Sequence, residues 1–233
     1  MKNRILGIIP ARGGSKSIPK KNTRLLLGKP LIAYTIEVAL KSKFVDRVIV
    51  SSDDKDTVEI AKKYGAEVPF IRPRELALDT TPMVLVLQHA VGFLEERENT
   101  NLDYVLLLQP TAPLRLVEDI DNALKKLMET GADSVISVSQ VDNVHPILMK
   151  RIENDLILPY CIEEKEGTRR QDYSPPAYMR NGAIYVVKRD ILMNNDSVWG
   201  KISRPYIMPP ERSVCIDSEL DFKLVEILLQ ERG

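Results

Sequence analysis

The sequence ILGIIPARGGSKSIPKKN, residues 5–22, places a short apolar run directly before a loop rich in glycine and lysine. The run Ile5–Ile9 is almost uninterrupted by polar residues, which is typical of a strand buried on both faces. The loop that follows, residues 11–22, holds two adjacent glycines and four cationic side chains. We therefore expect a buried strand whose carboxyl end carries an anion-binding loop.

The loop matches neither of the two common phosphate-binding patterns. Its first lysine follows a serine instead of the glycine of GxxxxGK[ST], and GxGxxG does not occur. Gly13 and Gly14 still let backbone N–H groups approach an anion, while Arg12, Lys16 and Lys21 can surround phosphate oxygens with positive charge. The residues alone leave open a simpler interpretation, a basic turn at the end of a strand.

Similar apolar runs recur along the chain, with amphipathic stretches between them. The predicted strands are residues 5–9, 47–51, 67–71, 104–108, 134–138 and 183–187. The predicted helices are residues 31–43, 56–64, 82–96, 117–130 and 218–231, the last with Leu220, Leu224, Ile227 and Leu228 on its buried side. Such alternation predicts parallel βαβ units, and hence an α/β fold with a doubly wound, mostly parallel sheet. A functional site is expected beyond the carboxyl ends of the strands.

The alternation stops between residues 141 and 180. This segment resembles short strands joined by polar loops, and it contains too much Ile, Leu and Tyr for a solvated spacer. We expect an insertion that forms a lid or an oligomer contact, within a single domain that spans residues 1–233.

Composition limits the classes of partner. The 233 residues contain 33 Lys and Arg against 33 Asp and Glu, so the net charge is zero and no overall field favours nucleic acid. The charge is polarised locally, because residues 1–30 carry eight basic side chains and no acidic one. That imbalance predicts an anion site near the amino terminus, although a solvated basic loop would give the same pattern.

The two cysteines, Cys161 and Cys215, are far apart and form no CxxC pair, which disfavours a zinc site and a disulfide framework and favours a reducing, cytoplasmic location. The apolar runs are far shorter than the roughly 20 residues of a membrane-spanning helix. We therefore expect no membrane partner.

The loop ARGGSKSIPKKN is followed in order by IVSSDD (residues 49–54), RPREL with Asp79 (residues 72–79), LLLQPTAPLR (residues 106–115), RNGAIY (residues 180–185) and IDSELDF (residues 216–222). This series resembles the acylneuraminate cytidylyltransferases, the family of CMP-sialic acid synthetases. The resemblance implies a Rossmann-like nucleotidyltransferase fold, a homodimer, and Mg²⁺ or Mn²⁺ as cofactor. The implied partners are CTP and a nine-carbon 2-keto-3-deoxy sugar acid, and the implied products are a CMP-sugar and pyrophosphate.

The same resemblance implies roles for individual residues. The implied nucleotide-binding residues are Ala11, Arg12, Gly13, Gly14, Ser15, Lys16, Lys21, Asn22, Ser52, Asp53 and Gln109. Lys21 is the expected catalytic cation, assisted by Arg12 and Lys16. The implied sugar-binding residues are Gln109, Arg115, Arg170, Asn181 and Tyr185. Without the family, Tyr185 is typical of strand core and Arg170 of a solvated loop.

The chain departs from the family pattern before its last helix. Many relatives have an Asp-x-Asp metal pair there, whereas this chain has Cys215 and Asp217. A neutral thiol is a poor ligand for Mg²⁺, which prefers oxygen. Asp217 is therefore predicted as the metal ligand, and Ser218 with Asp221 as a capping box of the helix.

Other polar residues have simpler interpretations. Residues 54–56, DKD, have the spacing of a metal-binding DxD motif but open a predicted helix, where acids favour the positive end of the dipole. Residues 119–121, DID, lie within a predicted helix and are expected to face solvent. His89 is expected to be partly buried and satisfied. His145 is a possible lid contact and is not predicted to be a base.

Three other readings stay open at this point. A KDO-type or sugar-1-phosphate nucleotidylyltransferase would share the fold but carry a different loop. A DxD glycosyltransferase would use an already activated sugar. A relative that binds sugar nucleotides without catalysis would explain the missing aspartate at position 215.

Overall fold

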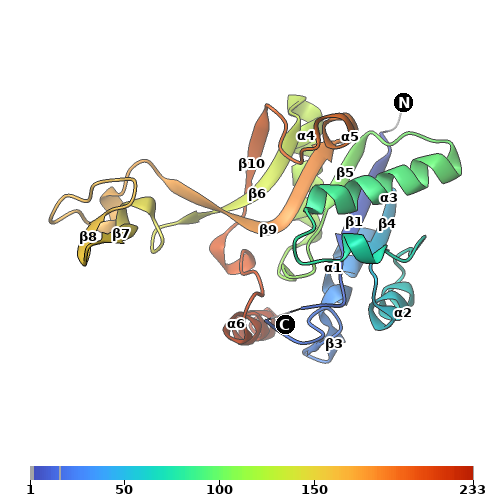
Figure 1. The fold of residues 1–233 in the computed structure, drawn as a ribbon, viewed down its shortest axis with the longest axis horizontal. Helices are drawn as coiled ribbons and strands as arrows, with labels where there is room; N and C mark the ends of the chain where they lie inside the picture. Colours follow the sequence, from blue (N-terminus) through green and yellow to red (C-terminus); the bar gives the residue numbers. More distant parts are fainter. Residues whose placement is uncertain (1–2, 16, 233) are drawn as a thin grey trace.

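The computed structural model describes residues 3–15 and 17–232 and has a twisted six-stranded sheet between two layers of helices (Figure 1). The strand order is β10-β6-β9-β5-β1-β4. These strands are β1 (Ile5–Pro10), β4 (Arg47–Ser51), β5 (Tyr104–Leu107), β6 (Ser134–Val141), β9 (Ala177–Lys188) and β10 (Ser203–Ile207). Only β9 among them runs antiparallel to its neighbours. The predicted mostly parallel α/β sheet is confirmed.

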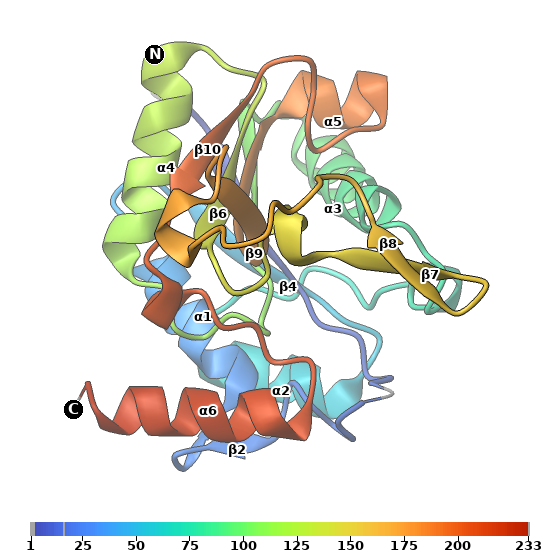
Figure 2. The same cartoon turned by 90° about the vertical axis from the view of Figure 1, so that its left-hand side faces the viewer.

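The helices cover both faces of the sheet, as the side view in Figure 2 shows. They are α1 (Leu31–Leu40), α2 (Lys55–Lys63), α3 (Met83–Glu98), α4 (Val117–Thr130) and α5 (Arg189–Asn195), while a further helix, α6 (Glu219–Gln230), lies beyond the carboxyl ends of the parallel strands (Figure 1). One core cluster joins the sheet to α1, α2 and α4, and a second joins its opposite face to α3 and α5. Four short 3₁₀ turns complete the described fold: η1 (Arg74–Leu76), η2 (Pro146–Leu148), η3 (Arg170–Asp172) and η4 (Pro210–Arg212).

The central strand β1 explains why the amino-terminal run is apolar throughout. All six of its residues are buried, because β4 and β5 flank it and helices cover both of its faces. A parallel strand in this position has no solvated side, so the alternation of polar and apolar residues disappears. The loop that follows β1 consequently emerges at the carboxyl edge of the sheet, beside the ends of β4 and β5.

The insertion is a projecting arm. Strands β6 and β9 continue past the body of the sheet, pairing as far as Val141 with Ala177, and a hairpin of β7 (Lys150–Glu153) and β8 (Leu156–Pro159) lies beyond them (Figure 1). Predicted bounds of 141 and 180 therefore fall within this strand pair. A second small hairpin, β2 (Leu25–Leu26) with β3 (Lys29–Pro30), follows the β1 loop.

Several predicted elements differ from those observed. The predicted strand at residues 67–71 is wrong, because only Glu67 forms an isolated bridge, with Ile49. Strand β10 and helix α5 were not predicted. The assigned face of α6 is wrong for Leu220, Leu224 and Ile227, which are exposed, whereas Leu228 packs against the core as predicted; the buried side chains are Phe222 and Val225. A third core cluster beneath α6 selects the Phe222 face.

Within the described ranges 3–15 and 17–232, no helix combines the length and the apolar character that crossing a bilayer requires.

Candidate functional site

A cleft of about 410 Å³ lies at the carboxyl ends of the parallel strands, where the sequence predicts a site. It is bordered by the β1 loop, the loop after β5, and Asp217 in the segment that precedes α6. The side chains that line it are Pro10, Arg12, Gly14, Ser15, Ser17, Lys21, Asn22, Arg72, Met83, Gln109, Pro110, Thr111 and Asp217. Seven of the predicted site residues are therefore brought together: Arg12, Gly14, Ser15, Lys21, Asn22, Gln109 and Asp217. Lys16 lies outside the described residues.

The β1 loop is held in shape by contacts behind the cleft. The backbone N–H of Gly13 donates to Asp53 Oδ1 at 3.0 Å, and Asn22 Nδ2 donates to the carbonyl of Arg12 at 3.0 Å. A Cβ at Gly13 would lie only 2.8 Å from the Cβ of Asp54, so the close approach of these two loops requires glycine. The loop is thus pinned against the end of β4.

The remaining predicted nucleotide residues support the cleft without lining it. Ala11 is buried and its N–H donates to Ser51, which continues the β1–β4 pairing by one residue. Ser52 is fully buried, and its hydroxyl accepts from the N–H of Asp54. The carboxylate of Asp54 then caps α2 by accepting from Thr57, which confirms the predicted helix start.

Arg72 is a cleft residue that residue chemistry alone did not single out. It is 4% exposed, and its guanidinium donates to the hydroxyl and the carbonyl of Ser51. Burial lowers the pKa of Arg72 to about 10, while Asp53 acts in the opposite direction and Arg12 reinforces the decrease. Arg12 itself pairs with Asp79, with 2.5 Å between Nη2 and Oδ1. In the sequence, the only indication that Arg72 belongs to the site was its position in the RPREL segment.

Lys21 connects the β1 loop to the chain before α6. Its Nζ donates to the carbonyl of Ile216 at 2.9 Å and lies 3.5 Å from Asp217 Oδ1. The Lys21 side chain is 13% exposed, whereas that of Asp217 is 77% exposed. A partly enclosed cation therefore faces the cleft beside a solvated carboxylate.

A second hollow of about 270 Å³ adjoins the cleft and shares Gln109 and Asp217 with it. Its other lining residues are Met179, Arg180, Asn181, Gly182, Tyr185 and Cys215. Three predicted sugar-binding residues, Gln109, Asn181 and Tyr185, thus meet here. Gly182 adopts a positive φ of 68°, and a Cβ there would lie 2.7 Å from Gln109 Oε1, so glycine at this position leaves space for the Gln109 side chain.

Asn181 is bound to protein on both ends of its amide. Its Oδ1 accepts from the Ser137 hydroxyl at 2.6 Å and from the Ala183 N–H, and its Nδ2 donates to Ser213 at 2.9 Å and to the sulfur of Met208. Asn181 therefore shapes the wall of the second hollow. Tyr185 is 7% exposed, and burial raises the pKa of its hydroxyl, with Arg180 opposing the rise.

The placement of Arg115 corrects its expected role in sugar binding. Its side chain is fully buried, and its guanidinium donates to the carbonyls of Gln109, Ala112 and Ala183 and to the hydroxyl of Thr35. Burial lowers the pKa of Arg115 to about 9. The residue fastens the loop after β5 to β9, and so it holds Gln109 in place without facing a hollow.

The segment before α6 has Cys215 at the position where an Asp-x-Asp metal pair would have its first aspartate. The Cys215 thiol donates to Thr111 Oγ1 at 3.1 Å, and burial raises its pKa, so the thiol stays neutral near pH 7. Ser218 and Asp221 form the predicted capping box of α6. Among the described residues, no three His, Cys, Asp or Glu side chains gather as a group that could hold a metal ion.

Arg170 lies apart from these hollows, on the projecting arm. It lines a separate hollow of about 380 Å³ with Gln140, Asp142, His145, Gln171, Tyr173, Pro176 and Ala177, and its guanidinium is 3.6 Å from Asp142. His145 is buried in the arm, where Nδ1 accepts from the N–H of Ile147 and Nε2 is 2.8 Å from the carbonyl of Pro175. His145 therefore organises the arm through both of its ring nitrogens.

Two expectations about isolated polar residues are wrong. Asp119 is fully buried instead of solvent-facing, because Arg212 and Tyr206 both bind its carboxylate. Asp121 is half-buried and accepts from Ser42. His89 is partly buried between Phe70 and Phe93, as expected, but its Nδ1 has no hydrogen-bond partner in the described chain.

Sequence comparison matches residues 6–198 to the profile of a family described as cytidylyltransferase. The chain belongs to the acylneuraminate group of this cytidylyltransferase family. It is 37% identical over 230 residues to the CMP-N,N'-diacetyllegionaminic acid synthase of Legionella pneumophila, covering 97% of each chain. It is 35% identical to a pseudaminic acid cytidylyltransferase of Campylobacter jejuni, covering 98% of this chain and 96% of the relative. An N-acylneuraminate cytidylyltransferase of Escherichia coli is 33% identical, and the match spans 54% of that longer protein.

Solved structures agree on the fold of this cytidylyltransferase. A CMP-2-keto-3-deoxy-manno-octonic acid synthetase complexed with CTP superposes with a TM-score of 0.74 at 18% identity, covering 99% of this chain and all of the other. A 4-diphosphocytidyl-2C-methyl-D-erythritol synthase from Anaerococcus prevotii gives a TM-score of 0.68 at 14% identity, covering 98% of this chain and 97% of the other. These structures support the Rossmann-like sheet that the resemblance implies, while the family match and the sequence relatives make the chain a nucleotidyltransferase.

Proposed function

We propose that this enzyme transfers the cytidylyl group of CTP to a nine-carbon 2-keto-3-deoxy sugar acid, with release of pyrophosphate. The observation that carries this proposal is the pair of adjoining hollows that share Gln109 and Asp217. One hollow presents the β1 loop with its cations, and the other is enclosed by β9. Relatives named for legionaminic, pseudaminic and acylneuraminic acids support the same class of acceptor.

The chemical requirement is mainly electrostatic. Nucleotidyl transfer depends on placing the acceptor hydroxyl near the α-phosphorus and on neutralising charge on the leaving pyrophosphate. Arg12, Lys21 and Arg72 line the nucleotide hollow and supply positive charge there. Because Lys21 is partly enclosed and anchored to Ile216, it is pre-organised for a group that becomes more negative as the bond breaks.

Asp217 is the residue that would hold a magnesium ion. Its side chain is exposed in both hollows, whereas Cys215 is a neutral thiol hydrogen-bonded to Thr111. A single carboxylate fits Mg²⁺, because this ion usually keeps several waters and binds substrate phosphates alongside one or two protein carboxylates. When bound, the ion would neutralise part of the negative charge of the CTP phosphates.

We further propose a homodimer formed through the projecting arm. Its β7–β8 hairpin exposes Ile152 by 75%, Leu156 by 61% and Ile157 by 74%, an apolar surface that a second copy would cover. Arg170 lies on this arm and is the candidate cation for the acid group of the sugar in the neighbouring subunit. A cytoplasmic location is proposed because CTP is the donor and both cysteines are free thiols.

Pyrophosphate release tests the proposed reaction. Purified enzyme with CTP and Mg²⁺ is offered legionaminic, pseudaminic and N-acetylneuraminic acids, the eight-carbon acid KDO, and a sugar 1-phosphate in separate reactions. We expect pyrophosphate and a CMP-sugar, identified by mass spectrometry, with at least one nine-carbon acid. Release only with KDO or a sugar 1-phosphate would replace the proposal, and release with none of the acceptors would contradict it.

A further inference from the structure

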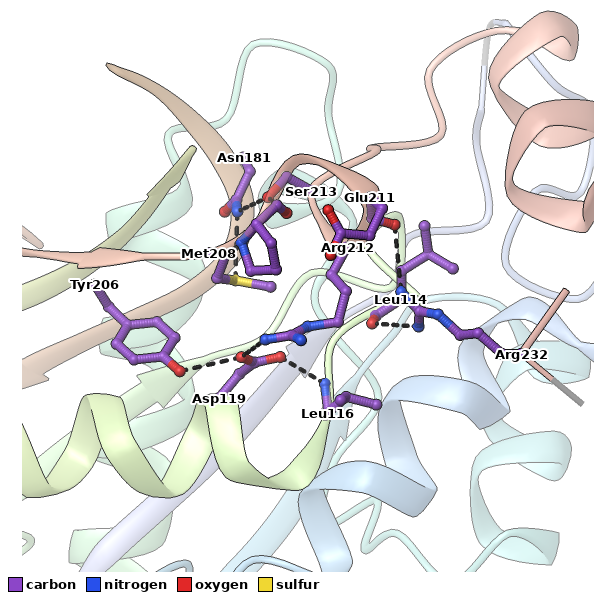
Figure 3. A network of polar contacts seen from close by, with 11 residues as sticks. Leu114, Leu116, Asp119, Asn181, Tyr206, Met208, Glu211, Arg212, Ser213 and Arg232 are labelled. Atoms are coloured by element: carbon purple, nitrogen blue, oxygen red, sulfur yellow. Dashed lines mark hydrogen bonds and ion pairs between the residues drawn. The ribbon is translucent and has the colours of Figure 1, made fainter. Parts of the chain in front are cut away.

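Residues 208–217 lie between β10 and Ser218, the N-cap of α6, and they carry Cys215 to the second hollow and Asp217 to both hollows. Figure 3 shows the polar contacts at the start of this 208–217 segment. There Arg212 binds Asp119, and Ser213 accepts from Asn181. At its other end the segment meets the loop after β5, where the N–H of Ile216 donates to the carbonyl of Thr111 at 2.8 Å.

The carboxylate of Asp119 is held in place on both of its oxygens. Its side chain is 1% exposed, and Oδ2 accepts from the N–H of Leu116 at 2.8 Å, which caps α4. Oδ1 accepts from Arg212 Nη2 at 2.7 Å and from the Tyr206 hydroxyl at 3.1 Å. One carboxylate therefore joins the first turn of α4, strand β10 and the 208–217 segment.

The far end of the segment places groups at the reaction site. The carbonyl of Ile216 accepts from Lys21 Nζ, and Asp217 lies next to the same cation. The position of Lys21 thus depends on where residues 216 and 217 lie. Arg212 touches neither hollow, so any effect of Arg212 on the reaction must pass through this segment.

Stability alone is a poor explanation for the ion pair between Asp119 and Arg212. Burying two charges has a desolvation cost that their attraction often only offsets. In addition, Arg212 Nε is buried without a hydrogen-bond partner in the described chain, which adds a further cost. Two apolar side chains of similar size would pack equally well, so the ion pair with its fixed direction must serve a purpose other than packing.

We infer that Asp119 and Arg212 are positioning residues that hold the 208–217 segment so that Ile216 and Asp217 keep Lys21 oriented in the cleft. The consequence for turnover rests on the proposed function, whereas the consequence for the segment does not. A misplacement of about 1 Å near reacting groups can cost about 10²-fold in rate. Loss of the pair should therefore lower kcat while leaving CTP binding nearly unchanged.

Three variants separate positioning from simple stabilisation. Arg212→Met should lower the melting temperature and reduce kcat about ten-fold or more, with the KM for CTP within about three-fold of wild type. Arg212→Lys should recover most of kcat because an ammonium still reaches Asp119. The double variant Asp119→Asn with Arg212→Met should recover the melting temperature, since no buried charge is left unpaired, yet keep the low kcat.

The matched control is a second ion pair with similar burial, formed by the helices α5 and α3 on the opposite face of the sheet. Arg189 and Glu95 are 2.8 Å apart with side-chain exposures of 23% and 10%, against 25% and 1% for Arg212 and Asp119. Arg189→Met should lower the melting temperature with kcat unchanged at a temperature where the variant stays folded. A double variant that regains kcat together with stability would reduce the Asp119–Arg212 pair to a stabilising contact and overturn the inference.

Hydrogen exchange gives a test that needs no turnover. The amide of Ile216, bonded to Thr111, should exchange faster in the folded double variant than in wild type or Arg189→Met. Unchanged exchange across residues 213–217 would show that burial of Ile216 holds the segment by itself, and it would overturn the inference. If wild-type enzyme released no pyrophosphate with any acid, the proposed function would fail while this measurement would still decide the positioning role.

Discussion

Lys21 is held by the carbonyl of Ile216, a residue 195 positions away in the chain. We expect Lys21→Met to lower kcat by about 10²- to 10³-fold, corresponding to about 3–4 kcal/mol for a donor that acts on developing charge. The KM for CTP should change much less. Steady-state kinetics measure both quantities. Lys20→Met is the control, because Lys20 is 75% exposed and pairs with Asp56; a wild-type kcat in Lys21→Met would remove this residue from the mechanism.

Substitutions at Cys215 and Asp217 test how the site binds a divalent cation. Asp217→Asn should raise the Mg²⁺ concentration needed for half-maximal rate, because it removes the one cleft carboxylate of this segment. Cys215→Ala should be nearly silent, whereas Cys215→Asp should lower that concentration by adding a second oxygen ligand. Magnesium titrations of the three variants, with wild type alongside, measure the effect. A wild-type curve for Asp217→Asn would leave Asp217 only at the start of the helix.

The Cys215 thiol should also be slow to react. Burial raises its pKa above the ordinary value of 9.0, so the reactive thiolate forms only at higher pH. In a Cys161→Ser background, which removes the exposed cysteine, the rate of alkylation by iodoacetamide should stay low through pH 8 and rise only above about pH 9. Mass spectrometry follows the reaction. Rapid alkylation at pH 7 would contradict a buried, neutral thiol.

At the level of secondary structure, Ser218 caps α6 and also directly follows the 208–217 segment. Ser218 Oγ accepts from the N–H of Asp221, and the Asp221 carboxylate accepts from the N–H groups of Asp217 and Ser218. Ser218→Ala should lower the free energy of unfolding by about 1 kcal/mol, the usual contribution of such a cap. Urea denaturation measures this loss.

The comparison variant for the α6 cap is Leu220→Ala. Leu220 is two residues along the helix and 75% exposed, so its truncation should stay within about 0.5 kcal/mol of wild type. Equal losses in Ser218→Ala and Leu220→Ala would mean that the outward face of α6 is covered, and that the cap is not the source of the difference.

At the level of the whole molecule, Arg170 and Lys21 lie in different hollows of one chain. If the arm completes the site of a second copy, Arg170→Ala and Lys21→Met will each be nearly inactive alone. Mixed dimers of the two should then regain activity, because one composite site carries both native residues. Subunit exchange followed by a pyrophosphate assay measures this recovery.

The control for subunit mixing is Arg169→Ala, a neighbouring exposed arginine that pairs with Asp172 on its own turn. It should retain activity without mixing. No recovery in verified mixed dimers of Arg170→Ala and Lys21→Met would contradict a site shared between copies. A monomer by light scattering that is fully active would contradict the proposed dimer.

The parts of the fold that follow from local spacing were predictable. The buried strand β1, helices α1 to α4 and the α6 cap depend on residue patterns a few positions long. Runs of Ile and Leu recorded burial on both faces of β1, and Asp54 and Ser218 marked helix starts. The β1 loop could be predicted as a candidate anion site because its glycines and cations are contiguous in the chain.

Tertiary structure decided the features that depend on distant partners. The sequence predicts that Arg115 binds the sugar and that Asp119 faces solvent, but packing against β9 and η4 buries both and assigns their hydrogen bonds. Helix α6 contains apolar residues on more than one side, and only the cluster formed with Ile18, Leu26 and Leu114 selects Phe222 for the core. The spacing of residues within one element indicates only the periodicity of that element. How the elements pack against one another decides which faces become buried, and it decides which distant side chains meet at Gln109 and Asp217.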